Sequence, residues 1–437
     1  MSRSTDSNRP SPSSTSNPSG PSSQSSTSNP SRLSPSLPYS RDNPVVLPAY
    51  ERICLLLQGG GALGAYHAGV YQGLHEAGIP INELSGISIG ALNVAIIAGN
   101  PPNKRIERLM EFWETICHPN FGLPPNPYVE HSLSAFSDAM RQAFHGWHAL
   151  NTVLIGQRGF FEPRIPPPAL VAHSSPKTVS YYDTAPLKQT LERLCDFDRI
   201  NSGEHYVSVA AVNVRTANFT YFDNRRCVLR AEHFMASGAL PPAFAAVEID
   251  GEYYWDGGLV SNTPLIRILD SRPMRDTLVF QVDVWSARGK VPTTLSEVND
   301  RIKDIRFSSR TRQVTDRLHQ EKYLRRLIQR MANDLPDGSP AKQEYLSAIE
   351  ALGDDKRYNI IHLIYRNKPY EQYFKDFQFD LPTMRDRWDA GLRDMRRTLQ
   401  QPHYLDMPDN LSGFVTHDIH REELMARMNS GHDAKRP

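Results

Sequence analysis

The sequence predicts an α/β protein: a three-layer α/β/α core around a central, mostly parallel sheet, followed by a mainly helical C-terminal extension. A short apolar run at 52–57, typical of a strand buried on both faces, leads directly into a glycine-rich turn and an apolar helix. A second strand-to-helix turn follows about 27 residues later, at 86–90, as expected of neighbouring parallel strands. Two further apolar runs, 207–214 and 277–284, predict additional strands of the same sheet.

The chain of 437 residues divides by composition into three regions. Of the first 40 residues 17 are Ser, and too few apolar side chains are present to offset the entropy of ordering, so residues 1–48 are expected to form a disordered tail. Residues 49–290 carry the strand and helix signals and are predicted to form the main globular domain. Residues 291–437 are predicted to form the largely helical extension.

Composition excludes several classes of protein. The 49 basic and 48 acidic side chains leave a net charge of +1, which argues against a nucleic-acid partner. The four cysteines are widely separated, so neither a disulfide framework nor a cysteine zinc site is expected, and a reducing, cytoplasmic location is favoured. The tail has no signal-peptide pattern, and the most apolar later window, 87–99, is shorter than the roughly 20 residues that cross a bilayer. Any membrane contact should therefore be peripheral.

The glycine-rich turn spans Gly59–Gly64. Its glycines allow a sharp turn that brings backbone N–H groups close to a ligand, and the N-terminus of the following helix attracts negative charge. The turn satisfies the G-x-G-x-x-G pattern of dinucleotide sites, but the nearest acidic residue, Glu83, precedes the next strand instead of ending it. No G-K-[ST] follows, which excludes a nucleotide P-loop. An anion-binding turn, a dinucleotide site and a plain structural turn remain as interpretations.

The candidate nucleophile is Ser88, the centre of the G-x-S-x-G motif formed with Gly86 and Gly90. This spacing suits a serine held on a strained turn between a strand and a helix, where larger neighbours would collide with the backbone. Alone, the motif could equally place Ser88 as a helix N-cap. Adjacent parallel strands end at one sheet edge, so we expect Ser88 and Gly59–Gly64 to lie together, one supplying the nucleophile and the other oxyanion donors.

The candidate base is Asp256, which follows the aromatic run 253–255 and precedes Gly257 and Gly258. A serine hydroxyl is a poor nucleophile until a base takes its proton, so a partner is required. Taken alone, the segment would be read as a strand that ends in an ordinary turn.

In this order and at these separations, G-G-G-A-L-G, G-I-S-I-G and D-G-G resemble the patatin-like phospholipase family. Segments 236–244 and 262–264 resemble those that flank the aspartate in that family. The resemblance covers about residues 52–290. It implies a patatin-like core in which 49–290 is the catalytic domain of a serine acyl-ester hydrolase. Members of the family act on phospholipids, galactolipids or neutral acylglycerols, and the resemblance implies neither a metal nor an organic cofactor.

The resemblance also implies the residue roles: a catalytic dyad of Ser88 as nucleophile and Asp256 as general base. The oxyanion hole would be made by backbone amides of the turn, with Gly59, Gly60, Gly61 and Gly64 as its members. The remaining motif glycines are Gly86, Gly90, Gly257 and Gly258. A carboxylate acts as base only if its pKa is raised, so Asp256 should be desolvated. Leu63 stands where the family usually has Arg or Lys, so we expect the chemistry to survive and substrate preference to differ.

Histidines offer an alternative base and a metal hypothesis. A conventional triad would use a histidine after the acid, and His362, within the apolar run 358–365, is the best placed, although an ordinary strand histidine explains it as well. The histidines after Asp256 are His319, His362, His403, His417, His420 and His432. Two pairs have helical spacing, His145 with His148 and His417 with His420. Neither has a third ligand in the pattern, so no metal site is predicted.

Two further segments carry open interpretations. Residues 121–168, rich in proline and aromatic residues, could form a lid or substrate gorge, or a plain surface excursion. Residues 301–331 hold ten basic and three acidic side chains with apolar residues at near-helical spacing. Such a basic helix could lie on a membrane or lipid-granule surface, or simply pack on the core. The partner expected is a lipid or other acyl ester; the rival functions are a dinucleotide-binding oxidoreductase and a catalytically silent lipid-binding or scaffold protein.

Overall fold

The computed structural model describes residues 39, 45–118, 138–171, 175–271, 273–351, 356–368, 371, 373–409 and 413–420. The described residues from Tyr39 onward belong to one compact unit. The predicted disordered tail lies almost wholly outside the described residues. So do His432, the side chains of His145 and His319, and the first part of the 121–168 segment.

A nine-stranded sheet forms the centre of this unit, in the order β11-β10-β9-β1-β2-β5-β8-β7 with β6 paired to β5. The strands of this sheet are β1 Arg52–Leu57, β2 Glu83–Gly86, β5 Tyr206–Asn213, β6 Phe219–Asp223, β7 Val247–Ile249, β8 Glu252–Asp256, β9 Thr277–Asp283, β10 Tyr358–Ile364 and β11 Phe414–His417. Neighbouring strands from β11 to β5 pair in parallel. Strands β6 and β8 each pair antiparallel with β5, and β7 pairs antiparallel with β8. The predicted strands 52–57, 207–214 and 277–284 are therefore confirmed.

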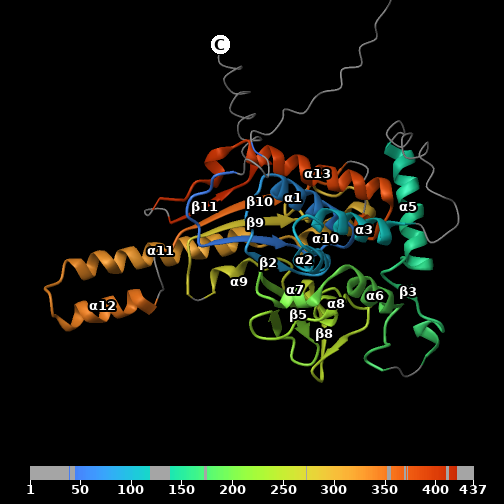
Figure 1. Ribbon diagram of the computed structural model, residues 1–437, viewed down its shortest axis with the longest axis horizontal. Helices are drawn as coiled ribbons and strands as arrows, with labels where there is room; N and C mark the ends of the chain where they lie inside the picture. The colour runs from blue at the N-terminus through green and yellow to red at the C-terminus, as the bar shows by residue number, and fades with distance from the viewer. Residues whose placement is uncertain are drawn as a thin grey trace, which may run out of the picture. The chain divides into compact units, whose positions relative to one another are not determined.

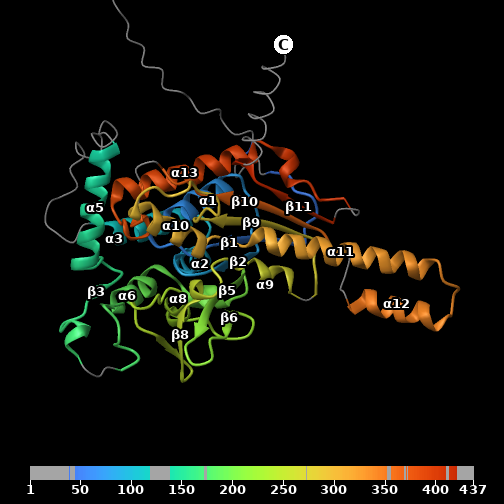
Figure 2. The same ribbon diagram turned by 180° about the vertical axis from the view of Figure 1, so that it is seen from behind.

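Helices cover both faces of the sheet, as Figures 1 and 2 show. Alternate residues of β1 explain this: Leu55 and Leu57 pack against the first layer, and Cys54 and Leu56 pack against the second. The first layer contains α1 Ala65–Glu76, α2 Ile89–Ala98, α3 Arg105–Cys117 and α13 Leu381–Leu399; the second contains α9 Leu265–Leu269. The predicted three-layer α/β/α core is confirmed.

The two helices α1 and α13 approach unusually closely, because each presents a glycine to the other. A Cβ on Gly69 would lie 1.8 Å from the carbonyl oxygen of Trp388, and one on Gly391 would lie 2.1 Å from that of Tyr66. The helix from the far end of the chain is thereby locked onto the helix that follows the glycine-rich turn.

The C-terminal region is mainly helical, as predicted, but it also extends the sheet. Its helices before α13 are α10 Leu295–Phe307, α11 Thr311–Asn333 and α12 Pro340–Ala351. Strand β10 pairs with β9, so the sheet runs continuously across the predicted boundary at residue 290, and that division of the chain stays a prediction. The prediction of a single helix over 301–331 is wrong, because α10 ends at Phe307 and a separate helix, α11, follows. The carbonyl oxygen of Phe307 accepts hydrogen bonds from the Gln58 and Asn262 side chains.

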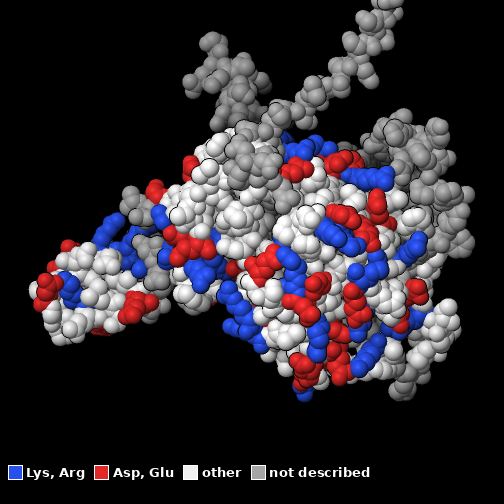
Figure 3. Space-filling view, viewed as in Figure 1, with Lys and Arg blue, Asp and Glu red and all other residues white. Residues whose placement is uncertain are grey.

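The remaining elements lie at the β5 to β8 end of the sheet or within the 138–183 segment. They are α5 Asp138–Ile155, β3 Glu162–Pro163, β4 Tyr182–Asp183, α6 Ala185–Leu194, α7 Phe197–Asn201 and α8 Ala231–Ser237. Acidic and basic side chains are interspersed over the face of the core shown in Figure 3. Among the described residues, no helix combines the length and apolar character that crossing a bilayer requires.

Candidate active site

Ser88 sits on a strained turn between β2 and α2. Its backbone has φ 56° and ψ −128°, in the left-handed half of conformational space that a non-glycine residue rarely adopts. The two motif glycines make the turn possible. A Cβ on Gly86 would lie 2.5 Å from the backbone of Gly90, and one on Gly90 would lie 2.2 Å from the carbonyl oxygen of Leu57. Ser88 is therefore held at the carboxyl edge of the parallel strands, where the sequence predicted it.

Asp256 ends β8 and lies beside Ser88. The backbone amide of Gly258 donates a hydrogen bond of 2.7 Å to its Oδ1, and the Ser88 hydroxyl lies close enough to this carboxylate to lower its pKa. The side chain is only 2% exposed, which confirms the predicted desolvation. Burial raises the pKa of Asp256 to about 7 from an ordinary value of 3.8, against the opposing effect of the Ser88 hydroxyl and the Gly258 amide. Gly257 is required here because a Cβ would meet the Ala210 carbonyl oxygen at 2.6 Å.

The glycine-rich turn lies against this pair, since a Cβ on Gly59 would be 3.0 Å from the Cβ of Ser88. The carbonyl oxygen of Gly59 accepts hydrogen bonds from Trp285 Nε1 at 2.9 Å and Asn262 Nδ2 at 3.0 Å, and its amide donates to the Asn262 carbonyl. No hydrogen bond to the amides of Gly60 and Gly61 is found among the described residues. These two amides are thus available to a ligand, whereas Gly64 serves packing: its Cβ would meet the Ile89 side chain at 2.7 Å.

Several residues that hold this arrangement carry no obvious sequence signal. Ser237 Oγ accepts a hydrogen bond from the Ser88 backbone amide at 3.0 Å. Gln58 Oε1 accepts from the amides of Val284 and Trp285, at 2.8 and 3.0 Å, and so ties the glycine turn to the end of β9. Ser237 and Asn262 lie in segments singled out as flanking motifs, although neither was assigned a role. Gln58 and Trp285 stand outside every motif.

A mostly apolar cavity of about 270 Å³ opens onto Ser88 and Asp256. Its walls combine the glycine turn with the predicted gorge segment, which contributes Thr152, Val153, Phe160 and Phe161. The C-terminal region contributes Phe307, Asp376, Phe377 and Phe379. The described part of the 121–168 segment therefore contributes to one wall of this cavity, and its role as a lid or substrate gorge stays a prediction.

Two carboxyl groups line this cavity, Asp256 and Asp376, and its described lining includes no Lys, Arg or His. Asp376 accepts hydrogen bonds from Lys303 Nζ at 2.7 and 3.0 Å, and burial raises its pKa although the lysine opposes this. Leu63, at the position that is basic in the resembled family, is fully buried in the core. The cation expected from the family pattern is thus replaced by an apolar side chain.

The histidine candidates lie elsewhere. His362 Nε2 is 2.6 Å from Asp283 Oδ2 on the neighbouring strand, and it does not line the cavity. Burial alone would lower the pKa of His362, but the Asp283 carboxylate outweighs it and raises the pKa. His417 stacks on Tyr404, and His420 pairs with Asp394. In the described part of the chain no three His, Cys, Asp or Glu side chains gather as metal ligands would.

Glu83, the acidic residue considered as a ligand for the ribose of a dinucleotide, has a structural role instead. Its carboxylate forms a buried ion pair of 2.6 Å with Arg52 on the adjacent strand. The Gly59–Gly64 turn lies against Ser88, and Glu83, being paired with Arg52, is not free to make the ribose contact considered for it.

The chain belongs to the patatin-like phospholipase family. Residues 55–269, which include both Ser88 and Asp256, match the family described as "Patatin-like phospholipase". Residues 305–411, which supply one wall of the cavity, match a second family described as "Patatin phospholipase".

Curated relatives share short segments with this chain. A "Patatin-like phospholipase domain-containing protein" of Caenorhabditis elegans is 43% identical over 61 residues, which are 14% of this chain and 4% of that protein. "Neuropathy target esterase sws" of Drosophila persimilis is 54% identical over 44 residues, 10% of this chain and 3% of that protein. The chain therefore matches only a few per cent of the length of these relatives.

Solved structures with similarity include VipD from Legionella pneumophila, with 14% identity and a TM-score of 0.35 over 86% of this chain and 73% of VipD. ExoU from Pseudomonas aeruginosa, solved with SpcU, has 15% identity and a TM-score of 0.27 over 69% of this chain and 68% of that one.

Proposed function

We propose that this protein is a serine acyl-ester hydrolase that cleaves fatty-acyl or related esters of lipids through an acyl-enzyme on Ser88. The observation that carries the proposal is that Ser88, on a strained turn, lies beside the buried Asp256 carboxylate in the lining of one cavity. Membership of the patatin-like phospholipase family supports a lipid substrate. The apolar cavity suits an acyl chain.

In the proposed mechanism, Ser88 Oγ attacks the ester carbonyl carbon while Asp256 accepts the hydroxyl proton. The oxyanion is stabilised by the amides of Gly60 and Gly61 and by the positive end of α2. Asp256 then returns the proton to the leaving alcohol as the ester C–O bond breaks. Water repeats these steps on the acyl-enzyme and releases the fatty acid. Neither step requires a metal or an organic cofactor.

The environment of the site supports a preference for neutral over anionic leaving groups. Asp376 places a second carboxylate in the cavity, and Leu63 removes the cation of the family pattern. Because Asp376 is already paired with Lys303, an anionic head group close to the ester would find no free cation in the described lining. Neutral acylglycerols and storage polyesters therefore rank ahead of anionic phospholipids as expected substrates. The four cysteines are free thiols, which supports placing the reaction in the reducing cytoplasm, with peripheral contact to a lipid surface.

A fluorophosphonate probe tests the proposal against both rival functions. We expect covalent labelling of the full chain that is lost in Ser88→Ala, because the probe reacts only with an activated serine. Absence of labelling in the natural chain would favour a silent lipid-binding protein or an oxidoreductase.

Two variants then separate a dyad from a triad. Asp256→Ala should abolish hydrolysis, whereas His362→Ala should retain it, because His362 is bound to Asp283 and lies away from the cavity. Loss of activity in His362→Ala with an unchanged melting temperature would contradict the dyad. A hydrolysis screen across phospholipids, acylglycerols and storage polyesters would identify the acyl donor.

A further inference from the structure

Large apolar side chains are exposed beside the mouth of the catalytic cavity. They come from α5 and from the loop between β3 and β4. We name this surface the apolar rim; it consists of Trp147, Leu150, Leu154, Ile165, Val179 and Tyr181. Each is between 49% and 94% exposed. Exposed apolar side chains are ordinary when scattered, but a group of this size beside a cavity indicates an interaction site.

The α5 part of the rim is one helical stripe. Trp147, Leu150 and Leu154 are spaced by three and four residues and so share a face, whereas Ala149 and Thr152 on the opposite side are buried. The stripe therefore follows from the amphipathic pattern of α5.

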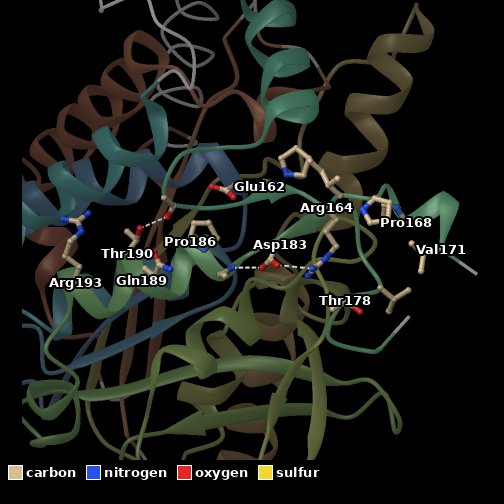
Figure 4. Close-up of a pocket in the computed structure, with 16 residues that line it drawn as sticks. Glu162, Arg164, Pro168, Val171, Thr178, Asp183, Pro186, Gln189, Thr190 and Arg193 are labelled. Atoms are coloured by element: carbon tan, nitrogen blue, oxygen red, sulfur yellow. Dashed lines mark hydrogen bonds and ion pairs between the residues drawn. The ribbon is translucent and has the colours of Figure 1, made fainter. Parts of the chain in front are cut away.

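The loop part of the rim is held firmly in place. Arg164 donates hydrogen bonds to Ser180 Oγ at 3.0 Å, to Asp183 at 3.1 Å and to the Lys177 carbonyl at 3.3 Å. Figure 4 shows Arg164 and Asp183 joined across the hollow that this loop encloses. The described part of this loop, in which only Arg164 and Lys177 are charged, lies at the lower right of Figure 3. These hydrogen bonds thus stabilise the loop in a conformation that leaves Ile165 and Val179 exposed to water.

The rim is continuous with the catalytic cavity. Tyr181 belongs to the rim and lines the cavity, and Val153, 47% exposed, lines it from α5. The hydroxyl of Tyr182 donates a hydrogen bond of 2.7 Å to the Val153 carbonyl, which joins the two parts of the rim. An apolar molecule that slides inward from the rim would reach Ser88 along apolar walls.

We infer that the apolar rim inserts into the surface of a lipid aggregate and feeds acyl esters from it into the cavity. This inference rests on the proposed hydrolase function. A protein seated on the rim would cover Val153 and Tyr181 and so obstruct the entrance. An aggregate of the substrate covers the same side chains and also delivers the ester. The contact is apolar, so it differs from the electrostatic contact considered for residues 301–331.

Vesicles of uncharged phosphatidylcholine test the rim, because they remove electrostatic attraction. The full chain should bind, and the fluorescence of Trp147, which is 63% exposed, should shift to the blue and be quenched by brominated acyl chains. Trp113, Trp285 and Trp388 are buried and Trp255 on β8 is half-buried, so Trp147→Phe should remove most of the shift and Trp255→Phe should leave it in place. Leu154→Glu and Ile165→Glu should each weaken vesicle binding by at least about 10-fold.

Leu324→Glu on α11 is a matched control, since Leu324 is 50% exposed and distant from the cavity lining. It should leave binding unchanged. The rim variants should lose hydrolysis of an emulsified ester and keep that of a monomeric short-chain ester. The inference would be overturned if the rim and control variants bound the vesicles equally. It would also be overturned if the natural chain formed a dimer that dissociated in the rim variants and not in the control variant. Binding lost in the rim variants, with no hydrolysis of monomeric ester by any chain, would support the rim and contradict the hydrolase.

Discussion

The indole nitrogen of Trp285 donates a hydrogen bond of 2.9 Å to the carbonyl oxygen of Gly59. Because a peptide unit is planar and trans, a fixed Gly59 carbonyl directs the amide of Gly60 to the opposite side. Asn262 Nδ2 binds the same oxygen at 3.0 Å. Two side chains from far along the chain thus set the direction of a proposed oxyanion donor.

Replacing Trp285 with Phe should therefore lower kcat roughly 10-fold and leave KM nearly unchanged, because one donor would lose its fixed direction. Steady-state kinetics on a monomeric ester provides the measurement. Trp388→Phe is the matched control: it removes an indole hydrogen bond to Gln72 of 2.6 Å away from the cavity. A similar fall in kcat for both variants would show that the effect is general destabilisation.

Because the backbone of Ser88 is strained, two variants that lose the same activity should differ in stability. Ser88→Ala and Ser88→Gly should both lose roughly 10⁶-fold in kcat, because each removes the proposed nucleophile. At φ 56° and ψ −128° glycine carries no Cβ penalty, so Ser88→Gly should be more stable to unfolding than Ser88→Ala by about 1 kcal/mol. Chemical denaturation of the two variants checks this. If Ser88→Ala were the more stable, the backbone would not be strained at this residue.

The pH dependence of activity should report Asp256. The proposed base acts only when deprotonated and its pKa is raised to about 7, so kcat/KM should increase as pH rises through about 7 and then level off. A pH profile on a monomeric ester measures this. A midpoint near the ordinary value of 3.8 would mean that burial does not tune the carboxylate.

The stability of the folded chain should vary with pH in the opposite sense. A carboxyl group whose pKa is raised on folding stabilises the protein most below its unfolded pKa, and this contribution is lost as pH rises through the folded value of about 7. Asp256→Asn is uncharged at every pH. Its melting temperature should therefore rise relative to the natural chain between the unfolded pKa of 3.8 and the folded value of about 7, and the difference should level off at higher pH. A constant difference over this range would contradict the buried, titrating carboxyl.

Asp376→Asn should shift substrate preference toward anionic esters. The change leaves the Lys303 ammonium without its carboxylate partner beside the cavity, so the local charge becomes more positive. The ratio of kcat/KM for an anionic ester to that for a neutral one should increase several-fold. Asp337→Asn, which removes the exposed partner of Lys342, should leave the ratio unchanged. An equal ratio in all three chains would mean that Asp376 does not select the head group.

Local patterns predicted much of the fold and the candidate catalytic pair. The strands around Ser88 and Asp256 are short apolar runs that end in glycine motifs, and such signals lie within about ten residues of the side chain concerned. Gln58, Trp285, Phe307 and Asp376 could not be found in this way. Their roles depend on hydrogen bonds and cavity walls that form between segments more than 200 residues apart, as between Gln58 and Trp285. The break after Phe307 was missed for the same reason.

The pairing of β10 with β9 makes truncation of the C-terminal region harmful to the sheet. Removing everything after residue 290 would retain every motif of the proposed catalytic site, but β9, which is buried along its whole length, would lose its neighbour β10. A bare, apolar edge strand invites pairing with other chains. The shortened protein would expose this edge together with the opened cavity, and inclusion bodies would be its expected fate on expression.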